Sequence, residues 1–412
     1  KLSKYRLSDL QIKKLHDRFI EIKESSNLNK KKEPTKLLIL SNNTFDFIIS
    51  NLSVAGLRNG LSIEITILPF GNIISQLIQG IENGHLKVKD FDYIFLALDH
   101  NGLNIVDDFD EKNKKGVFSN AIDEIESIKK IVEEKFEATL IIQSIVSNSE
   151  NLFGSLEKHL TPTKNQIIKE VNQYILDLSL DSNILLFDLE EIVNKIGLVN
   201  WLDPRMYYWA KLPFSSNYCG IYSNKVINLI MSDKGLSKKA LILDLDNTLW
   251  GGVIGEDGLQ GIKLGQGPEG EQYVAFQNYI KRLKNRGIIL AVCSKNDEEN
   301  ARQPFLNHPD MRLNLKDIAV FVANWNNKAD NIRFIANTLD ISLDSIVFID
   351  DSPVERAFVE KELPMVAVPE LSLDPSQYVR ILDQKRYFET IAYSQEDGSR
   401  GEMYRANSQR KE

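Results

Sequence analysis

The sequence predicts an α/β protein with two doubly wound domains, each built on a parallel sheet with helices on both faces. Short apolar runs alternate with longer segments whose apolar residues recur at helical spacing, and this alternation is typical of parallel sheets. The chain has 412 residues, which is more than one hydrophobic core usually serves, so two domains are expected.

Strands and helices are expected in turn along the first half. The expected strands are Leu37–Leu40, Ile63–Leu68, Tyr93–Leu98, Thr139–Ile145 and Ile184–Leu189. Helical spacing lies between them, for example over Phe45–Leu57 and Ile73–Ile81. An aromatic-rich stretch, Trp201–Ala210, reads as a loop near the end of this domain.

Composition shifts mark the domain limits. The polar stretch Ser232–Lys239 contains Gly235 and three lysines, which is typical of a boundary. We expect an N-terminal helical segment at 1–34, a first α/β domain at 35–235, a second at 236–393, and a polar tail or truncated helix at 394–412. The natural chain is expected to continue past Glu412.

Polar residues follow each expected strand of the second half. Residues 241–250 read Leu-Ile-Leu-Asp-Leu-Asp-Asn-Thr-Leu-Trp, an apolar run that ends in Asp244 and Asp246. The later groups are Ser294-Lys295-Asn296 after the strand Ile288–Cys293, Lys328 after Val320–Asn324 at the start of a helical segment Lys328–Leu339, and Asp350-Asp351 after Ile346–Ile349. Because the carboxyl ends of parallel strands meet at one edge of a sheet, these side chains should converge.

These residue types suit phosphoryl transfer to a carboxylate. A carboxylate attacks phosphorus, a hydroxyl and an ammonium neutralise phosphate oxygens, and an acidic pair holds Mg²⁺. Asp244 and Asp246 cannot both stay ionised cheaply unless a cation lies nearby or one of them holds a proton. The sequence therefore predicts a divalent metal together with acid/base chemistry.

In order and spacing, the four groups resemble the motifs of the haloacid dehalogenase (HAD) superfamily. Its motifs are DxDx[TV], a Ser or Thr after a strand, a Lys, and an acidic pair. The stretches 244–252, 294–296 and 348–356 look like the FkbH-like branch, subfamily IIIC, and the likeness runs roughly from Lys36 to Asn407. Response-regulator receivers share the chemistry, but their acidic pair precedes the phosphorylated Asp, and that order is reversed here.

The resemblance implies a role for each matching position and Mg²⁺ as the cofactor. Asp244 would be the nucleophile and Asp246 the general acid/base. Phosphate would be bound by Thr248, Ser294, Lys295, Asn296 and Lys328, with Ser294 and Lys328 also catalytic, and the metal by Asp244, Asp350, Asp351 and, through its backbone carbonyl, Asp246.

The first domain looks like the SGNH-hydrolase, flavodoxin-like architecture, but it departs from that family at the reactive positions. The first strand ends in Ser41-Asn42-Asn43-Thr44, not in Gly-Asp-Ser, and Ala97–His100 replaces the Gly-x-Asn-Asp block. Asp203 is followed three residues later by Met206 instead of the His base. Because a hydroxyl needs such a base, the domain is expected to be non-hydrolytic.

The spacing between motifs leaves no room for an inserted cap domain. Trp250–Gly270 reads as a short hairpin-like flap before a helix at Glu271–Arg286, and one helix and one strand separate Ser294 from Lys328. An uncapped site admits water, so the first domain or a neighbouring subunit of a homo-oligomer is expected to cover it and to recognise the substrate.

Three functions are consistent with these residues. The leading one is a Mg²⁺-dependent phosphatase or phosphotransferase, with an aspartyl-phosphate on Asp244, acting on a phosphorylated small molecule or a carrier-bound substrate. The second, implied by the resemblance, is a glyceryl transferase that loads an acyl-carrier protein from 1,3-bisphosphoglycerate. That chemistry needs a reactive thiol, whereas Cys293 should point away from the site and Cys219 has no recognisable context. The third is a phosphate-binding scaffold without turnover.

Composition limits the classes of binding partner and the location that the sequence allows. A net charge of −8 argues against a nucleic-acid binder, and every apolar run is far shorter than a membrane span. Two cysteines make neither a disulfide framework nor a zinc site, so a cytoplasmic location is expected.

Overall fold

The computed structural model describes most of the chain, in segments: residues 7–25, 33–69, 71–87, 89–107, 111–147, 150, 152–160, 163–181 and 183–394. It divides into two compact units, Arg6–Leu229 and a second from Ile230 onward. The two units therefore meet between Leu229 and Ile230, a few residues before the domain boundary that the sequence predicts after Gly235. The tail expected at 394–412 lies, beyond its first residue, outside the described residues.

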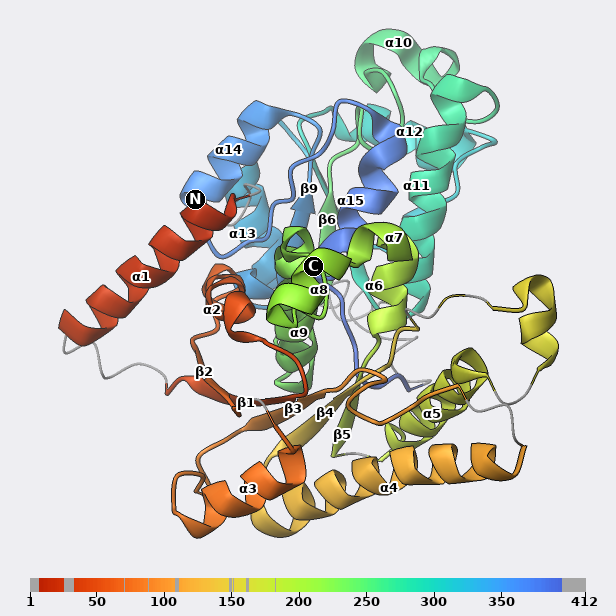
Figure 1. The fold of residues 1–412 in the computed structure, drawn as a ribbon. Coiled ribbons are helices and arrows are strands. Elements are labelled where there is room, and N and C mark those ends of the chain that lie inside the picture. The colour runs from red at the N-terminus through yellow and green to blue at the C-terminus, as the bar shows by residue number, and fades with distance from the viewer. Residues whose placement is uncertain are drawn as a thin grey trace. The chain divides into compact units, whose positions relative to one another are not determined.

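The first unit contains a five-stranded sheet in the order β2-β1-β3-β4-β5, with every pair parallel (Figure 1). Its strands are β1 (Thr35–Ser41), β2 (Ile63–Ile67), β3 (Tyr93–Ala97), β4 (Thr139–Gln143) and β5 (Ile184–Phe187). This is the order of doubly wound flavodoxin-like sheets, in which the chain crosses from β2 back past β1 to β3. Ligands of such sheets bind at the carboxyl edge beside that switch point.

Helices cover both faces of the first sheet. The α-helices described in this part of the chain are α1 (Asp9–Ser25), α2 (Ile49–Arg58), α3 (Ile73–Glu82), α4 (Glu111–Lys135), α5 (Lys164–Leu178), α6 (Leu189–Ile196), α7 (Leu198–Trp201), α8 (Pro204–Ala210) and α9 (Cys219–Asp233), of which α7 and α8 lie at the carboxyl edge. In α4 the buried residues Ala121, Ile125, Ile128 and Val132 recur at helical spacing. They join one core with residues of α3, α5 and one face of the strands.

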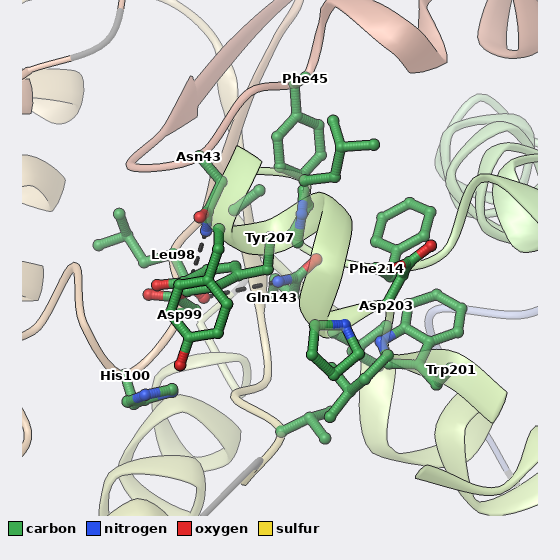
Figure 2. Close-up of a pocket in the computed structure, with 18 of the residues that line it drawn as sticks. Asn43, Phe45, Leu98, Asp99, His100, Gln143, Trp201, Asp203, Tyr207 and Phe214 are labelled. Carbon is green, nitrogen blue, oxygen red and sulfur yellow. Dashed lines mark hydrogen bonds between the residues drawn. The ribbon is translucent and has the colours of Figure 1, made fainter. Parts of the chain in front are cut away.

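The segment expected as a loop at Trp201–Ala210 is helical instead. Asp203 begins α8, because its Oδ1 accepts a hydrogen bond from the backbone N–H of Met206 at 3.1 Å, and Pro204 occupies the first turn. Trp201 is buried and stacks on Phe214, with ring centroids 4.4 Å apart (Figure 2). The Asp-Pro pair was the sequence signal for this helix start.

The second unit contains a four-stranded parallel sheet in the order β8-β7-β6-β9. Its strands are β6 (Ala240–Leu243), β7 (Ile289–Ser294), β8 (Ile318–Ala323) and β9 (Ile346–Ile349). Every residue of β6, β7 and β9 is buried, as expected where helices cover both faces of a sheet. The prediction of two parallel α/β sheets is confirmed.

The helices of the second unit pack in two layers. They are α10 (Ile254–Gly261), α11 (Pro268–Asn285), α12 (Glu298–Asn307), α13 (Lys328–Leu339), α14 (Pro353–Glu362) and α15 (Tyr378–Lys385). Leu241 and Leu243 face α11, α12 and α15, whereas Ile242 faces α13 and α14 on the other side. None of the described helices of the chain has the length and apolarity needed to cross a bilayer.

The flap between β6 and α11 is a hairpin only at its base. Gly251 and Lys263 form an antiparallel bridge, with backbone hydrogen bonds of 3.0 and 2.7 Å. The flap is therefore hairpin-like at its base, as expected, but the short helix α10 between the two bridged residues was not expected. This stretch is described throughout and holds no inserted domain.

Gly270, in the first turn of α11, fixes the return of this flap to the sheet. A Cβ at this position would lie 2.8 Å from Gly265 N and 2.9 Å from Gly265 O, and both are backbone atoms that cannot move aside easily. We therefore expect Gly270→Ala to lower the free energy of unfolding by about 1–3 kcal/mol, as overpacking usually does. Thermal or urea unfolding measures the change.

The matched control is Gly255→Ala in α10, where nothing lies within 4 Å of the new methyl group. Alanine also favours helix over glycine, so this variant should be neutral or slightly stabilising. If the two variants unfold at the same midpoint, the close packing at Gly270 does not constrain the flap.

Candidate active site

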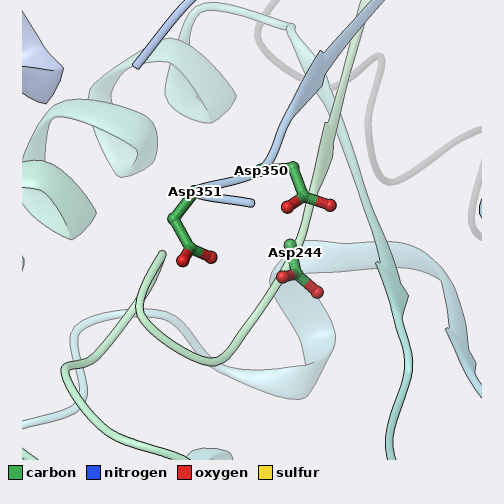
Figure 3. A group of neighbouring side chains, drawn as sticks. All are labelled: Asp244, Asp350 and Asp351. Carbon is green, nitrogen blue, oxygen red and sulfur yellow. The ribbon is translucent and has the colours of Figure 1, made fainter. Parts of the chain in front are cut away.

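Three carboxylates gather at the carboxyl edge of the second sheet. Asp244 directly follows β6, while Asp350 and Asp351 follow β9, the neighbour of β6 in the sheet (Figure 3). One oxygen from each carboxylate can be chosen so that all three lie within 4.8 Å of one another. Asp350 is fully buried and Asp244 nearly so. Oxygen-only ligands of this kind fit a hard divalent cation such as Mg²⁺.

Lys328 places an ammonium between two of these carboxylates. Its Nζ lies 3.0 Å from Asp244 Oδ1 and 2.5 Å from Asp350 Oδ2. The Asn327 side chain accepts a hydrogen bond from Asp330 N, so α13 begins at Lys328 and holds it at the sheet edge. Burial lowers the pKa of Lys328, but Asp244 and Asp350 outweigh burial and raise that pKa well above its usual value.

The carboxylates carry more charge than Lys328 neutralises. Burial raises the pKa of Asp350, Asp244 raises it further, and Lys328 only partly opposes them. The pKa of Asp351 is also raised, again by burial and then by Asp244. A cation bound among these oxygens would relieve this repulsion, so the electrostatics agree with the ligand set.

Asp246 has a separate set of partners. Its Oδ1 accepts hydrogen bonds from Trp250 Nε1 at 2.9 Å and Ile254 N at 3.0 Å. Its Oδ2 accepts from Asn296 Nδ2 at 2.8 Å. Burial raises the pKa of Asp246, although the bonds from Ile254 and Trp250 lower it in part. A carboxyl group held in one orientation with a raised pKa suits general acid/base work.

The other expected phosphate ligands differ in where they lie. Ser294 ends β7 and is buried at the same edge as the carboxylates. Thr248 Oγ1 donates to Asp351 Oδ1 at 3.2 Å and accepts from Asp351 N at the same distance, so it supports the acidic pair. Lys295 is more exposed, and its Nζ lies 2.6 Å from Glu355. Asn296 is committed to Asp246.

Sequence reasoning missed two supporting residues, Arg356 and Trp250. Arg356 is buried and donates from one guanidinium nitrogen to the carbonyl oxygens of Asp350 at 2.7 Å and Asp351 at 2.6 Å, so it fixes the acidic loop. Trp250 lies within the stretch 244–252 and Arg356 within 348–356, so both belong to the segments that carry the resemblance. A pattern of charges and apolar residues does not show that either side chain turns back onto the loop before it.

Neither cysteine is placed as a reactive thiol. Cys293 is fully buried, and its Sγ lies 3.8 Å from the carbonyl oxygen of Lys328. Burial raises the pKa of this thiol well above its usual value, which disfavours the nucleophilic thiolate. Cys219 is also buried.

Comparison with known proteins finds a solved structure that resembles the chain over most of its length. No protein-family model and no curated protein matches the chain. The crystal structure of the N-terminal part of the protein BF1531 from Bacteroides fragilis, which contains a phosphatase domain and is complexed with Mg, superposes with a TM-score of 0.81 at 30% sequence identity. The alignment covers 94% of this chain and 100% of that chain. Tagatose-6-phosphate ketose/aldose isomerase from Escherichia coli aligns over 92% of this chain and 87% of its own, at 10% identity and a TM-score of 0.19, which carries no structural argument.

Proposed function

The chain belongs to the family of the Mg-complexed phosphatase-domain protein BF1531, and from this premise we propose that it is a Mg²⁺-dependent phosphatase of the HAD type that works through an aspartyl-phosphate on Asp244. The observation that carries this proposal is the group formed by Asp244, Lys328, Asp350 and Asp351 at one sheet edge. Its substrate class is a phosphate monoester of a small molecule or a carrier-bound group.

In the first step, a carboxylate oxygen of Asp244 attacks phosphorus, and the bond from phosphorus to the leaving oxygen breaks. Because Oδ1 of Asp244 is paired with Lys328, Oδ2 is the oxygen proposed to attack. Asp246 donates its proton to the leaving oxygen, and its raised pKa favours the protonated form that this step needs.

In the second step, Asp246 takes a proton from water, the water oxygen attacks phosphorus, and Asp244 leaves as a carboxylate with release of phosphate. Lys328 and the hydroxyl of Ser294 are proposed to bind phosphate oxygens throughout. Asn296 acts by orienting Asp246, and Thr248 by holding Asp351. When bound to Asp244, Asp350, Asp351 and the carbonyl of Asp246, Mg²⁺ would neutralise charge on the phosphoryl oxygens.

Removal of the metal tests the proposed function. With a panel of phosphate monoesters, turnover should require Mg²⁺, stop after treatment with EDTA, and return when Mg²⁺ is added. Zn²⁺ should restore it poorly, because the ligands are all hard oxygens. Full activity after exhaustive chelation would rule out the metal-dependent mechanism, and phosphate binding without turnover of any ester would favour a scaffold.

A further inference from the structure

A cavity of about 190 Å³ lies within the first unit, at the carboxyl edge of its sheet (Figure 2). The ends of β1, β3 and β4 form one side of it, and residues of α7 and α8 form the other. This is the switch point of the sheet, where ligands of doubly wound folds bind. The volume exceeds that of a cavity of roughly 150 Å³ that accepts benzene, so a molecule built on one six-membered ring would fit.

The hydroxyl or thiol nucleophile of a serine- or cysteine-type hydrolase is not found in the described part of this cavity's lining. The described lining contains no Ser, Thr or Cys. Ser41, at the end of β1, is buried and donates its hydroxyl hydrogen to the carbonyl oxygen of Ala97 at 2.9 Å. Cleavage through an activated serine is therefore not supported here, and we consider the cavity as a binding site.

Asp99 fixes a negative charge in the lining. Its Oδ1 accepts hydrogen bonds from Asn42 Nδ2 at 2.7 Å and from the backbone N–H groups of Asn101 and Gly102 at 2.8 and 3.0 Å. Burial alone would raise the pKa of Asp99, but these bonds and that from Asn43 more than offset it and lower the pKa. Oδ2 accepts only from Asn43 among the described residues, at 3.0 Å, so it can take a further donor.

His100 supplies the second polar group. It lines the cavity, is only 3% exposed, and its Nδ1 has no hydrogen-bond partner among the described residues. Burial lowers the pKa of His100, so the imidazole is neutral and one of its nitrogens can accept a hydrogen bond. A buried polar atom without a partner is unfavourable unless a ligand satisfies it.

The other charged groups of the described lining are acids, set among aliphatic and aromatic residues. Asp203 and Glu150 add two carboxylates, and no Lys or Arg is among the described lining residues. Lys164 interacts with Asp99 and Glu150 from nearby, but it also faces Asp107, so the acids remain in excess. Trp201, Tyr207 and Phe214 also line the cavity and give it an apolar wall. Trp201 and Phe214 stack on each other, and Lys211 Nζ lies 4.8 Å from the centre of the Tyr207 ring, so the wall offers a ligand mainly ring edges.

We propose that this cavity binds a small cyclic amine bearing hydroxyl groups, of the amino-sugar class. The ammonium pairs with the carboxylates of Asp99 and Asp203, a ligand N–H or O–H donates to His100, and the ring lies against the aromatic side chains. Every residue that carries this site belongs to the first unit, and none of them belongs to the proposed phosphatase centre.

Isothermal titration calorimetry on the full chain tests the proposed amine site. The ligands compared are sugars that have the same six-membered ring and differ in charge. Glucosamine should bind saturably, with one molecule per chain. Glucose and N-acetylglucosamine, which lack the ammonium, should bind at least about tenfold more weakly, as expected when a charge partner is removed. Absence of glucosamine binding, or equal affinity for all three sugars, would overturn the proposal.

Variants of the lining residues test whether glucosamine binds in this cavity. Asp203→Asn combined with Glu150→Gln should weaken glucosamine binding by at least about tenfold, and it should leave α8 capped because Asn caps helices as well as Asp. The matched control is Glu82→Gln with Asp123→Asn, which removes the same charge from exposed helix positions of the same unit and should change nothing.

Asp244→Asn should bind glucosamine with unchanged affinity, because Asp244 is not among the residues that line the cavity. Loss of binding in Asp244→Asn, or equal losses in the cavity and control variants, would place the amine elsewhere and contradict the proposal. Both results are independent of whether the chain hydrolyses phosphate esters, since no substrate is present in the titration.

Discussion

Asp244→Asn is expected to lower kcat by more than about 10⁴-fold on the best phosphate ester found, because loss of a nucleophile usually costs at least this much. The amide cannot attack phosphorus, and the three-carboxylate group loses one of its charges. The fold should persist, because removal of this charge relieves repulsion within the acidic group even as one partner of Lys328 is lost. Steady-state kinetics with circular dichroism as a check on folding measures both effects.

The matched control is Asp297→Asn, which lies soon after Ser294 on the same side of the sheet. Asp297 caps α12 by accepting hydrogen bonds from the backbone N–H groups of Glu299 and Asn300. Asn can replace it in that role, so activity should stay close to that of the unaltered chain. If Asp244→Asn retained activity within about tenfold of the unaltered chain, Asp244 could not be the nucleophile.

Asp246→Asn is expected to slow turnover by roughly 10²–10⁴-fold, the usual contribution of a positioned acid/base group. The loss should be larger for alkyl phosphates than for p-nitrophenyl phosphate, because an alkoxide needs a proton to depart and a nitrophenolate does not. Mg²⁺ should still bind, since the backbone carbonyl of Asp246 remains and its side chain lies outside the three-carboxylate group.

Kinetics on the two ester types and calorimetric titration of Mg²⁺ check this prediction. An equal loss for both esters would remove the general-acid role from Asp246. Loss of Mg²⁺ binding would mean that its side chain acts mainly on the metal.

Local patterns predicted the framework of the site because parallel strands have a simple signature. The continuous apolar run Ile346–Ile349 is the whole of β9, and helical spacing gave α13 its observed limits, Lys328–Leu339. Once the strands are parallel, the residues that follow them must meet at one edge, so Asp244, Lys328 and Asp350 could be grouped from the sequence alone.

The orientation of individual side chains could not be predicted in the same way. The contact of Asn296 with Asp246, fifty residues earlier in the chain, was not expected, and the phosphate-binding role expected for Asn296 stays a prediction. The helix α10 was not predicted from the sequence. Gly258 interrupts it with a non-helical φ of 66°, so the segment shows no clear helical period. Contacts of this kind depend on how distant segments pack, and the spacing of residues along one segment does not specify them.

The aspartyl-phosphate is tested most directly by trapping it. The Asp246→Asn variant should hydrolyse the intermediate slowly but still form it from p-nitrophenyl phosphate, whose leaving group needs no proton. It is mixed with Mg²⁺ and this ester and then treated with borohydride, which reduces an acyl phosphate to an alcohol. The proposed mechanism predicts that peptide mass spectrometry finds homoserine at position 244, and only in samples that received substrate. Homoserine at another acidic residue, or none at any position while phosphate is still released, would contradict it.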